Sequence, residues 1–128
     1  MAMIKGKVIR GNQIGRTIGF PTANLLVTPK EPSLTTGVYG VKVLYKGSRY
    51  NGIMNVGVRP TINKEDLQIH YEVHIFNFHE TIYGEEIKVN DCFFVREERP
   101  FDSINQLVLQ IKKDIKFVRS RFLLQSEC

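Results

Sequence analysis

The stretch GVYGVKVLYKGSRYNGIMNVG, residues 37–57, shows most clearly how this chain folds. Its side chains alternate between two faces, which is the period of a β-strand. The dipeptide Lys46-Gly47 then separates two such runs, and a two-residue connection that contains glycine is typical of a tight hairpin turn. The pattern therefore predicts a β-hairpin. One face of its first strand carries Val38, Gly40, Lys42 and Leu44, and the other carries Tyr39, Val41, Val43 and Tyr45.

Further runs with a period of two lie on both sides of this hairpin. Short alternating strands bounded by turn residues are typical of an antiparallel sandwich or barrel. Between them we expect long surface loops, where functional residues often gather. The predicted strands are residues 4–10, 69–76 and 86–97, and the predicted loops are residues 28–36, 57–66 and 77–84.

The period changes after residue 102. Ser103, followed three positions later by Gln106, forms a capping box that predicts the start of a helix. The helix should run over about residues 103–124 and pack its single apolar face across the β-structure, because an isolated helix of this kind is marginal in water. We therefore expect one domain over residues 1–128. The apolar stripe consists of Ile104, Leu107, Val108, Ile111, Ile115, Val118 and Phe122.

The composition limits the class of protein. The chain has 128 residues, of which 42% are hydrophobic, and it contains no apolar run long enough to cross a bilayer. Its two cysteines, Cys92 and Cys128, lie far apart and do not suggest a disulfide framework, so we expect a cytoplasmic protein. The net charge of +5 is scattered and lacks an arginine-rich tail. This distribution favours a nucleotide partner, or simply a solvated basic face, over a nucleic acid.

The segment VIRGNQIGRTIGFPTAN, residues 8–24, combines features of a phosphate site. Its glycines recur every four residues and would let backbone N–H groups approach a phosphate chain, with Arg16 as a cation inside the loop. Thr22 and Asn24 then offer two neutral oxygens two residues apart, which suits Mg²⁺ that is also held by nucleotide phosphates. The alternative is a plain turn, in which Asn24 adopts a left-handed conformation and Thr22 caps a neighbour.

Five elements in order resemble the riboflavin kinase (flavokinase) family, which occurs alone or as the C-terminal module of bacterial bifunctional FAD synthetases. They are GKVIRG with GRTIGFPTANL, GVYGVKV, MNVGVRPTI, YEVHIFNF with IYGEEIKV, and VREERPFDSINQLVLQIKKD. The resemblance covers nearly the whole chain. It implies a six-stranded antiparallel Greek-key barrel with a C-terminal helix, and Mg²⁺-dependent transfer of the γ-phosphoryl group of ATP to riboflavin, giving FMN and ADP.

The resemblance also implies roles for individual residues. Thr22 and Asn24 would hold the magnesium ion that bridges the ATP phosphates. Asn77 departs from the acidic or histidine residues also seen at its position, so its contact would come from the backbone. The remaining nucleotide positions are Gly11, Arg16, Ile75 and Tyr83, and the flavin positions are Arg96, Arg99 and Phe101.

Glu72 is the candidate catalytic base, because a kinase needs a carboxylate that can accept the proton of the attacking hydroxyl. It lies in IHYEVHIF between Tyr71 and Val73, which face the other way. On the residues alone an exposed strand glutamate is an equal alternative, and the resemblance favours catalysis. His70, Glu72 and His74 share a face, but their spacing along an extended strand disfavours a single zinc ion. The three histidines, His70, His74 and His79, have no assigned role.

A second function remains open from the residues. A flavin-binding or RNA-binding barrel could keep this fold without the chemistry, because small barrels host many ligands. The combination of Thr22, Asn24 and Glu72 distinguishes the kinase from such a binder. We find no candidate FMN adenylyltransferase module in these 128 residues, although an N-terminal module of that kind could belong to a longer parent chain.

Overall fold

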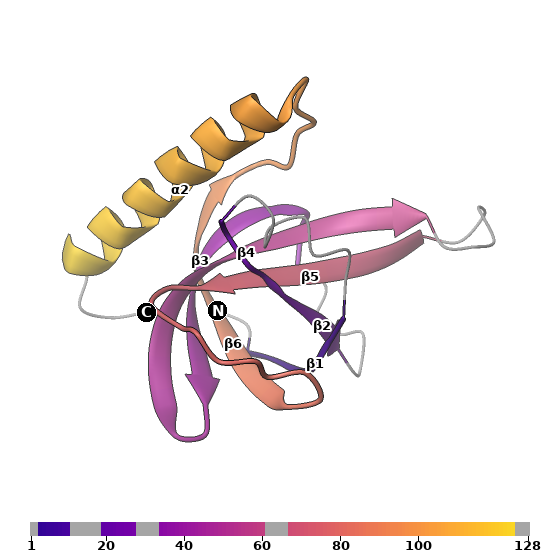
Figure 1. Ribbon diagram of the computed structural model, residues 1–128, viewed down its shortest axis with the longest axis vertical. Helices are drawn as coiled ribbons and strands as arrows, with labels where there is room; N and C mark the ends of the chain where they lie inside the picture. The colour runs from indigo at the N-terminus through magenta and orange to yellow at the C-terminus, as the bar shows by residue number, and fades with distance from the viewer. Residues whose placement is uncertain (1–2, 11–18, 28–33, 61–66, 125–128) are drawn as a thin grey trace.

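The computed structural model describes residues 3–10, 19–27, 34–60 and 67–124 and contains a closed barrel of six antiparallel strands in the order β1-β2-β5-β4-β3-β6. A helix, α2, lies along the outside of the barrel (Figure 1). This is the fold class expected from the sequence. The elements are β1 (Met3–Ile9), β2 (Ala23–Val27), β3 (Gly37–Tyr45), β4 (Ser48–Pro60), β5 (Leu67–Ile75), β6 (Glu86–Arg96) and α2 (Ile104–Leu124).

The hairpin of β3 and β4 forms as its sequence predicts. The two strands pair from Gly37 opposite Val56 to Tyr45 opposite Ser48, which leaves Lys46 and Gly47 as a two-residue turn. Both turn residues have positive φ angles, 48° and 81° respectively. Positive φ at both central positions is the type I′ turn, whose twist matches that of the flanking strands.

Strand β2 was not apparent from the sequence. The residues Ala23–Val27 look like the end of a turn-rich segment, yet they pair with β1 on one side and with β5 on the other. The plain-turn alternative for this segment is therefore wrong from Ala23 onward. The predicted loop over residues 57–66 also starts too early, because β4 continues to Pro60 by pairing with β5 as far as Leu67.

The barrel interior is filled by one of the two faces of each strand. Apolar side chains from all six strands meet there, and those of Val41, Met54, Val56, Val73 and Val89 have no exposed area. The opposite face of the β3–β4 hairpin is covered by α2, so both faces of β3 are buried. This explains why the first hairpin strand carries apolar residues on both sides.

A second, smaller core joins α2 to the barrel. Val38, Ile53, Phe76 and Val118 are buried in it. At the start of the helix the Gln106 N–H donates to the Ser103 hydroxyl at 3.2 Å, which confirms the predicted cap. Gln106 Oε1 accepts from the N–H of Asp102, one residue before the position that a capping box uses.

Two expectations from composition meet the structure with different outcomes. In the part of the chain that the structure describes, every helix is too short or too polar to cross a bilayer. Cys92 on β6 is disulfide-bonded, contrary to the expectation that the chain has no disulfide framework, and Cys128 lies outside the described residues.

Candidate functional site

A row of polar side chains crosses the outer face of three neighbouring strands. The register places Asn24 of β2 directly opposite Glu72 of β5, and Glu72 directly opposite Asn55 of β4. Directly paired residues of antiparallel strands project from the same face of a sheet. Tyr71 and Val73, on either side of Glu72, are buried in the barrel, so the carboxylate points outward as predicted. All three polar residues of this row are half-buried.

A cavity of about 240 Å³ opens at the end of the barrel beside this row. Thr22 lies on its wall, two residues before Asn24, together with apolar side chains from β1, β2 and β5. The segment that connects β5 to β6 forms the other wall. Predicted nucleotide residues on this cavity are Thr22, Ile75 and Tyr83.

The connecting segment, residues 76–85, is held in place by backbone hydrogen bonds to β1. The Gly84 N–H donates to the Val8 carbonyl and the Val8 N–H donates to the Glu85 carbonyl, both at 2.8 Å. Asn77 has a φ of 56° and an exposed side chain, and the cavity is lined by the residue after it, Phe78. The guanidinium of Arg10 lies 4.7 Å from the centre of the Tyr83 ring, which adds a cation beside the cavity.

Arg96 lies at the far end of the same outer face and is anchored to the helix. Val38, which pairs with Asn55, also pairs with Arg96, so this outer face continues across the apolar Val38 of β3 to Arg96 of β6. Arg96 Nη2 lies 2.9 Å from Oδ2 of Asp114, and its Nε donates to both carboxylate oxygens. Asp114 belongs to α2 and is 4% exposed. Such a bidentate pair fixes the guanidinium plane.

Arg99 joins the same network through a glutamine. Its Nη2 donates to Oε1 of Gln110, and Gln110 Nε2 donates to Asp114 at 2.8 Å. Both guanidinium groups lie near the Phe101 ring, with Arg96 at 5.7 Å and Arg99 at 5.1 Å from its centre. The structure thus brings all three predicted flavin residues together beside α2.

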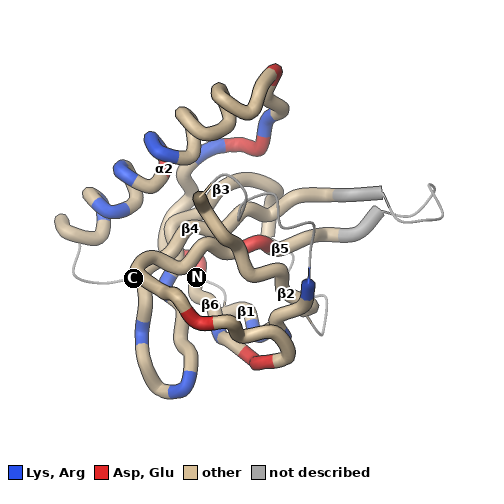
Figure 2. The backbone as a smooth tube through the Cα atoms, viewed as in Figure 1, with Lys and Arg blue, Asp and Glu red and all other residues tan. Residues whose placement is uncertain are grey.

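Positive charge follows the helix. Asp114 is the one acidic residue of α2, and it is paired with Arg96. Figure 2 shows basic residues along the middle and the C-terminal half of the helix, and a field of this sign attracts polyanions such as nucleotides. These residues are Lys112, Lys113, Lys116, Arg119 and Arg121.

His74 lies two residues after Glu72 on the same strand. Its Nδ1 is 2.7 Å from the carbonyl oxygen of Pro21. Burial lowers the pKa of His74, the Pro21 hydrogen bond opposes this, and the nearby Arg119 lowers the pKa further. Among the described residues no three His, Cys, Asp or Glu side chains are grouped to hold a metal ion.

Sequence comparison identifies the family. The profile of the flavokinase family, described as riboflavin kinase, matches residues 1–122. The chain belongs to the riboflavin kinase family. It is 47% identical over 122 residues to the RNA-binding riboflavin kinase RibR of Bacillus subtilis, covering 95% of this chain and 52% of RibR. It is 45% identical over 120 residues to the bifunctional riboflavin kinase/FMN adenylyltransferase of Haemophilus influenzae, covering 93% of this chain and 38% of that protein. This riboflavin kinase-family chain thus spans about a third to a half of the length of the curated relatives that it matches.

Solved structures agree with this fold. A Streptococcus pneumoniae protein described as a macrolide-efflux protein is 38% identical, with a TM-score of 0.85 over 91% of this chain and 38% of that one. Riboflavin kinase from Trypanosoma brucei superposes with a TM-score of 0.65 at 23% identity, over 94% of this chain and 79% of that one. At that identity the second likeness concerns the fold alone.

The riboflavin kinase family implies a magnesium ion, and the donor set present here fits it. The Thr22 hydroxyl and the Asn24 amide are neutral oxygen donors at the start of β2, where Asn24 lies opposite Glu72 of β5. Hard oxygen ligands in small number, completed by water and phosphate, are what Mg²⁺ prefers. Gly11 and Arg16, the other predicted residues of the phosphate loop, lie outside the described residues.

Two residues of this region, Asn55 and Asp114, were not singled out by sequence reasoning, and His74 was considered there only as a zinc ligand. Asn55 donates to the Glu98 carboxylate at 3.0 Å and extends the polar row, Asp114 anchors Arg96, and His74 holds Pro21. Asp114 carried a signal: it lies within the apolar stripe of the helix, between Ile111 and Val118, where an acidic residue needs a buried partner. The Asn55 and His74 contacts depend on strand pairing, so no local signal reveals them.

Proposed function

We propose that this chain transfers the γ-phosphoryl group of ATP to the 5′-hydroxyl of riboflavin with the help of Mg²⁺, giving FMN and ADP. One observation carries the proposal beyond family membership: Asn24 pairs directly with Glu72, at the strand end where Thr22 lines a cavity. This arrangement supports a metal-bound phosphate terminus and a proton acceptor in one place.

Glu72 is the proposed general base. It would accept the proton of the riboflavin hydroxyl as that oxygen attacks the γ-phosphorus and the bond to the ADP oxygen breaks. When bound, Mg²⁺ supplies charge neutralisation on the phosphate oxygens. Thr22 and Asn24 would hold the ion and orient the chain of phosphates toward Glu72. Positioning and electrostatic stabilisation then account for most of the rate.

The cavity beside Thr22 is the proposed nucleotide site. Its volume of about 240 Å³ suits part of a nucleotide, such as the base, rather than the whole of ATP. Ile75 and Tyr83 would contact this part of the ligand, with Asn77 contributing through its backbone. Gly11 and Arg16 would contact the phosphates.

The arginine network at the start of α2 is the proposed flavin site. The Phe101 ring offers an aromatic face on which the flavin ring system can stack. Arg96 and Arg99 would donate hydrogen bonds to flavin oxygens while Asp114 and Gln110 keep them in place. Preorganised donors of this kind lower the ordering cost of binding.

The direct test is product formation. The purified chain is incubated with ATP, Mg²⁺ and riboflavin, and FMN is separated from riboflavin by chromatography. We expect FMN in the complete mixture and none when EDTA replaces Mg²⁺. A complete mixture that yields no FMN, with riboflavin still bound as judged by fluorescence quenching, would favour the non-catalytic flavin-binding barrel instead.

The RNA-binding form of the alternative is tested in parallel, because one relative is named as an RNA-binding riboflavin kinase and this chain covers only 52% of it. We propose that this chain binds nucleotides rather than nucleic acid. We also propose that it acts in the cytoplasm, and this rests on family membership, because the disulfide at Cys92 removes the argument from the cysteines. The reaction would end at FMN, and an adenylyltransferase module elsewhere in a longer chain would convert FMN to FAD. Gel retardation of RNA by this chain at physiological salt would contradict the proposal that it does not bind nucleic acid.

A further inference from the structure

His74 occupies the point where the pairing of β2 with β5 stops. The ladder runs from Leu25 opposite Tyr71 through Asn24 opposite Glu72 and ends at Ala23 opposite Val73. Before Ala23 the chain runs through Thr22 back to Pro21, which has no N–H to continue a ladder. The His74 side chain reaches the Pro21 carbonyl at this point, with Nδ1 at 2.7 Å from the oxygen.

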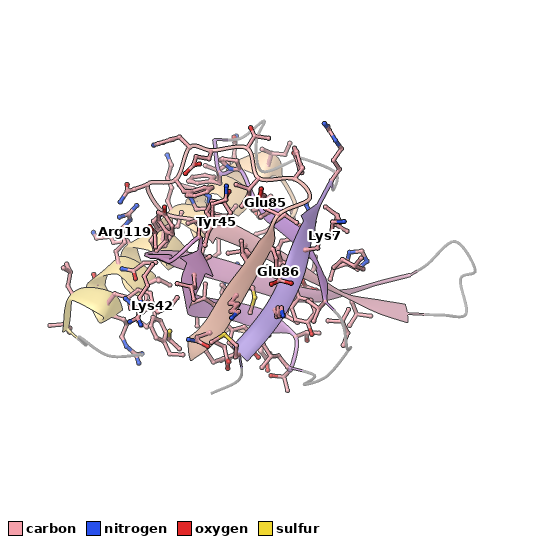
Figure 3. All side chains as sticks on the ribbon, turned by 90° about the horizontal axis from the view of Figure 1, so that it is seen from below. Lys7, Lys42, Tyr45, Glu85, Glu86 and Arg119 are labelled. Atoms are coloured by element: carbon pink, nitrogen blue, oxygen red, sulfur yellow. The ribbon has the colours of Figure 1, made fainter. Side chains whose placement is uncertain are left out.

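The imidazole ring is held from two sides. Phe20 meets it edge-on with ring centres 5.9 Å apart, and Phe76 meets it at 5.8 Å. Arg119 of α2, labelled in Figure 3, lies over the Phe76 ring at 4.4 Å and so closes this cluster from the helix side. Aromatic contacts of this geometry are favourable and restrict how far the ring can rotate.

We propose that His74 is a positioning residue, whose Nδ1–H bond to the Pro21 carbonyl fixes the backbone in front of Thr22 and so holds Thr22 and Asn24 next to Glu72. The expected effect on metal and nucleotide binding rests on the proposed kinase function, whereas the hydrogen bond between His74 and Pro21 does not depend on it. A carbonyl oxygen can only accept, so Nδ1 must carry the proton. Because burial disfavours the charged form of His74, the neutral Nδ1–H tautomer is the one expected at pH 7.5.

The same bond explains why a histidine rather than an aliphatic residue occupies this strand position. An aliphatic side chain would leave the Pro21 carbonyl to water and free the segment to shift by a fraction of an ångström. Groups that orient metal ligands through one intermediate bond typically change metal affinity by about 10- to 100-fold when removed. Misplacing reacting groups by about 1 Å costs a comparable factor in rate.

Three variants separate the hydrogen bond from the ring. In His74→Asn the side-chain amide can still donate to Pro21, His74→Phe keeps a ring but loses the donor, and His70→Asn on the same strand is the matched control. The readouts are Mg·ADP affinity by calorimetry, riboflavin affinity by fluorescence quenching, kcat and KM for ATP, and amide hydrogen exchange over residues 19–24.

We expect His74→Phe to weaken Mg·ADP binding by about 10-fold or more while riboflavin affinity stays within about 2-fold. Exchange at the Thr22 and Asn24 amides should accelerate in the same variant. His74→Asn should stay within about 3-fold of the wild type, because a donor of similar reach replaces Nδ1. Equal losses in both variants, or none in His74→Phe, would overturn the proposal.

A measurement on the wild type keeps the proposal testable if His74→Phe does not fold. Long-range ¹H–¹⁵N NMR distinguishes the two ring nitrogens, and we expect the proton on Nδ1. A proton on Nε2 alone would refute the assignment. If the wild type makes no FMN, the kinase proposal fails, whereas the NMR and exchange results still decide the role of His74.

Discussion

At the scale of single residues, Glu72 is central because it lies between two amide side chains on neighbouring strands. Asn24 and Asn55 flank it in register, and its own strand neighbours face the barrel interior. The backbone of Glu72 is therefore fixed by pairing of β5 with β2 and β4, and its carboxylate lies on the outer face of the barrel. Rigid strands position a catalytic group more accurately than loops do.

Replacing Glu72 by glutamine tests this role. Glu72→Gln keeps the shape of the side chain but removes the proton acceptor, so we expect turnover to fall by about 10²- to 10⁴-fold, the usual contribution of general-base catalysis. Riboflavin affinity should change little. Steady-state FMN formation and fluorescence titration measure the two quantities. Unchanged turnover would exclude Glu72 as the base.

Thr22 allows a second test at this scale, directed at the metal. Thr22→Ala removes a proposed oxygen ligand at the cavity wall. We expect a rise in the Mg²⁺ concentration needed for half-maximal rate and a higher KM for ATP. A Mg²⁺ titration of the initial rate measures both, and Thr36→Ala, at an exposed threonine before β3, is the control. If Thr22→Ala and the wild type respond alike to Mg²⁺, the metal assignment is wrong.

At the scale of elements, α2 is both a cover for the barrel and a support for the proposed flavin site. Val118 and the side chains around it supply the apolar contact, and Asp114 supplies a largely buried ion pair with Arg96. Breaking a buried pair leaves the other charge without compensation, which is more costly than the pair itself is stabilising. The position of α2 thus fixes the side chains of Arg96 and Arg99, which contact Asp114 and Gln110 of the helix.

Asp114→Asn tests this coupling. We expect a loss of about 3–5 kcal/mol in the free energy of unfolding at most, reduced where the amide keeps one hydrogen bond to Arg96. Riboflavin affinity should fall as well, whereas Mg·ADP affinity should hold because that site lies at the other end of the row. Urea denaturation and the two binding assays measure these effects. Lys113→Gln, an exposed change on the same helix, provides the control.

A loss of Mg·ADP affinity equal to the loss of riboflavin affinity would contradict this local role of Asp114. It would mean that the helix supports the whole outer face rather than its β6 end. An unchanged unfolding free energy would also contradict the argument, because it would show that the Arg96 charge does not depend on this carboxylate.

At the scale of the whole molecule, the stability of the fold should depend on pH through His74. Burial lowers its pKa from 6.5, so the unfolded chain binds a proton at this residue more readily than the folded chain does. The free energy of unfolding therefore rises with pH over the range in which the unfolded chain binds more protons at His74 than the folded chain does. The contribution is fully present above about pH 6.5 and is lost as the pH falls from there through the pKa of the folded state.

Thermal unfolding between pH 5 and pH 7.5 checks this expectation. The wild type should lose stability as the pH falls from 7.5 to 5. The loss should be smaller in His74→Asn, because the asparagine amide does not titrate. His70→Asn should retain the slope of the wild type. Parallel curves for the wild type and His74→Asn would show that other groups govern the acid sensitivity.

The sequence by itself determined the local elements and nominated the residues of the candidate site. Alternation over residues 37–45, the Lys46-Gly47 turn and the apolar stripe after Ser103 each depend on neighbours a few residues apart, so pattern reading finds them. The order of the motifs identified the family for the same reason. Glu72 could be nominated because its flanking residues alternate with it.

The tertiary structure decided which residues that are distant in the sequence become neighbours. Ala23–Val27 is a strand only because β1 and β5 supply partners for its backbone, and that pairing places Asn24 opposite Glu72, 48 positions away in the chain. The burial of Asp114 and the His74–Pro21 bond arise in the same way. A local pattern predicts which face of its own strand a residue occupies. Which residues of other strands lie beside it depends on how the strands pair and pack when the barrel closes.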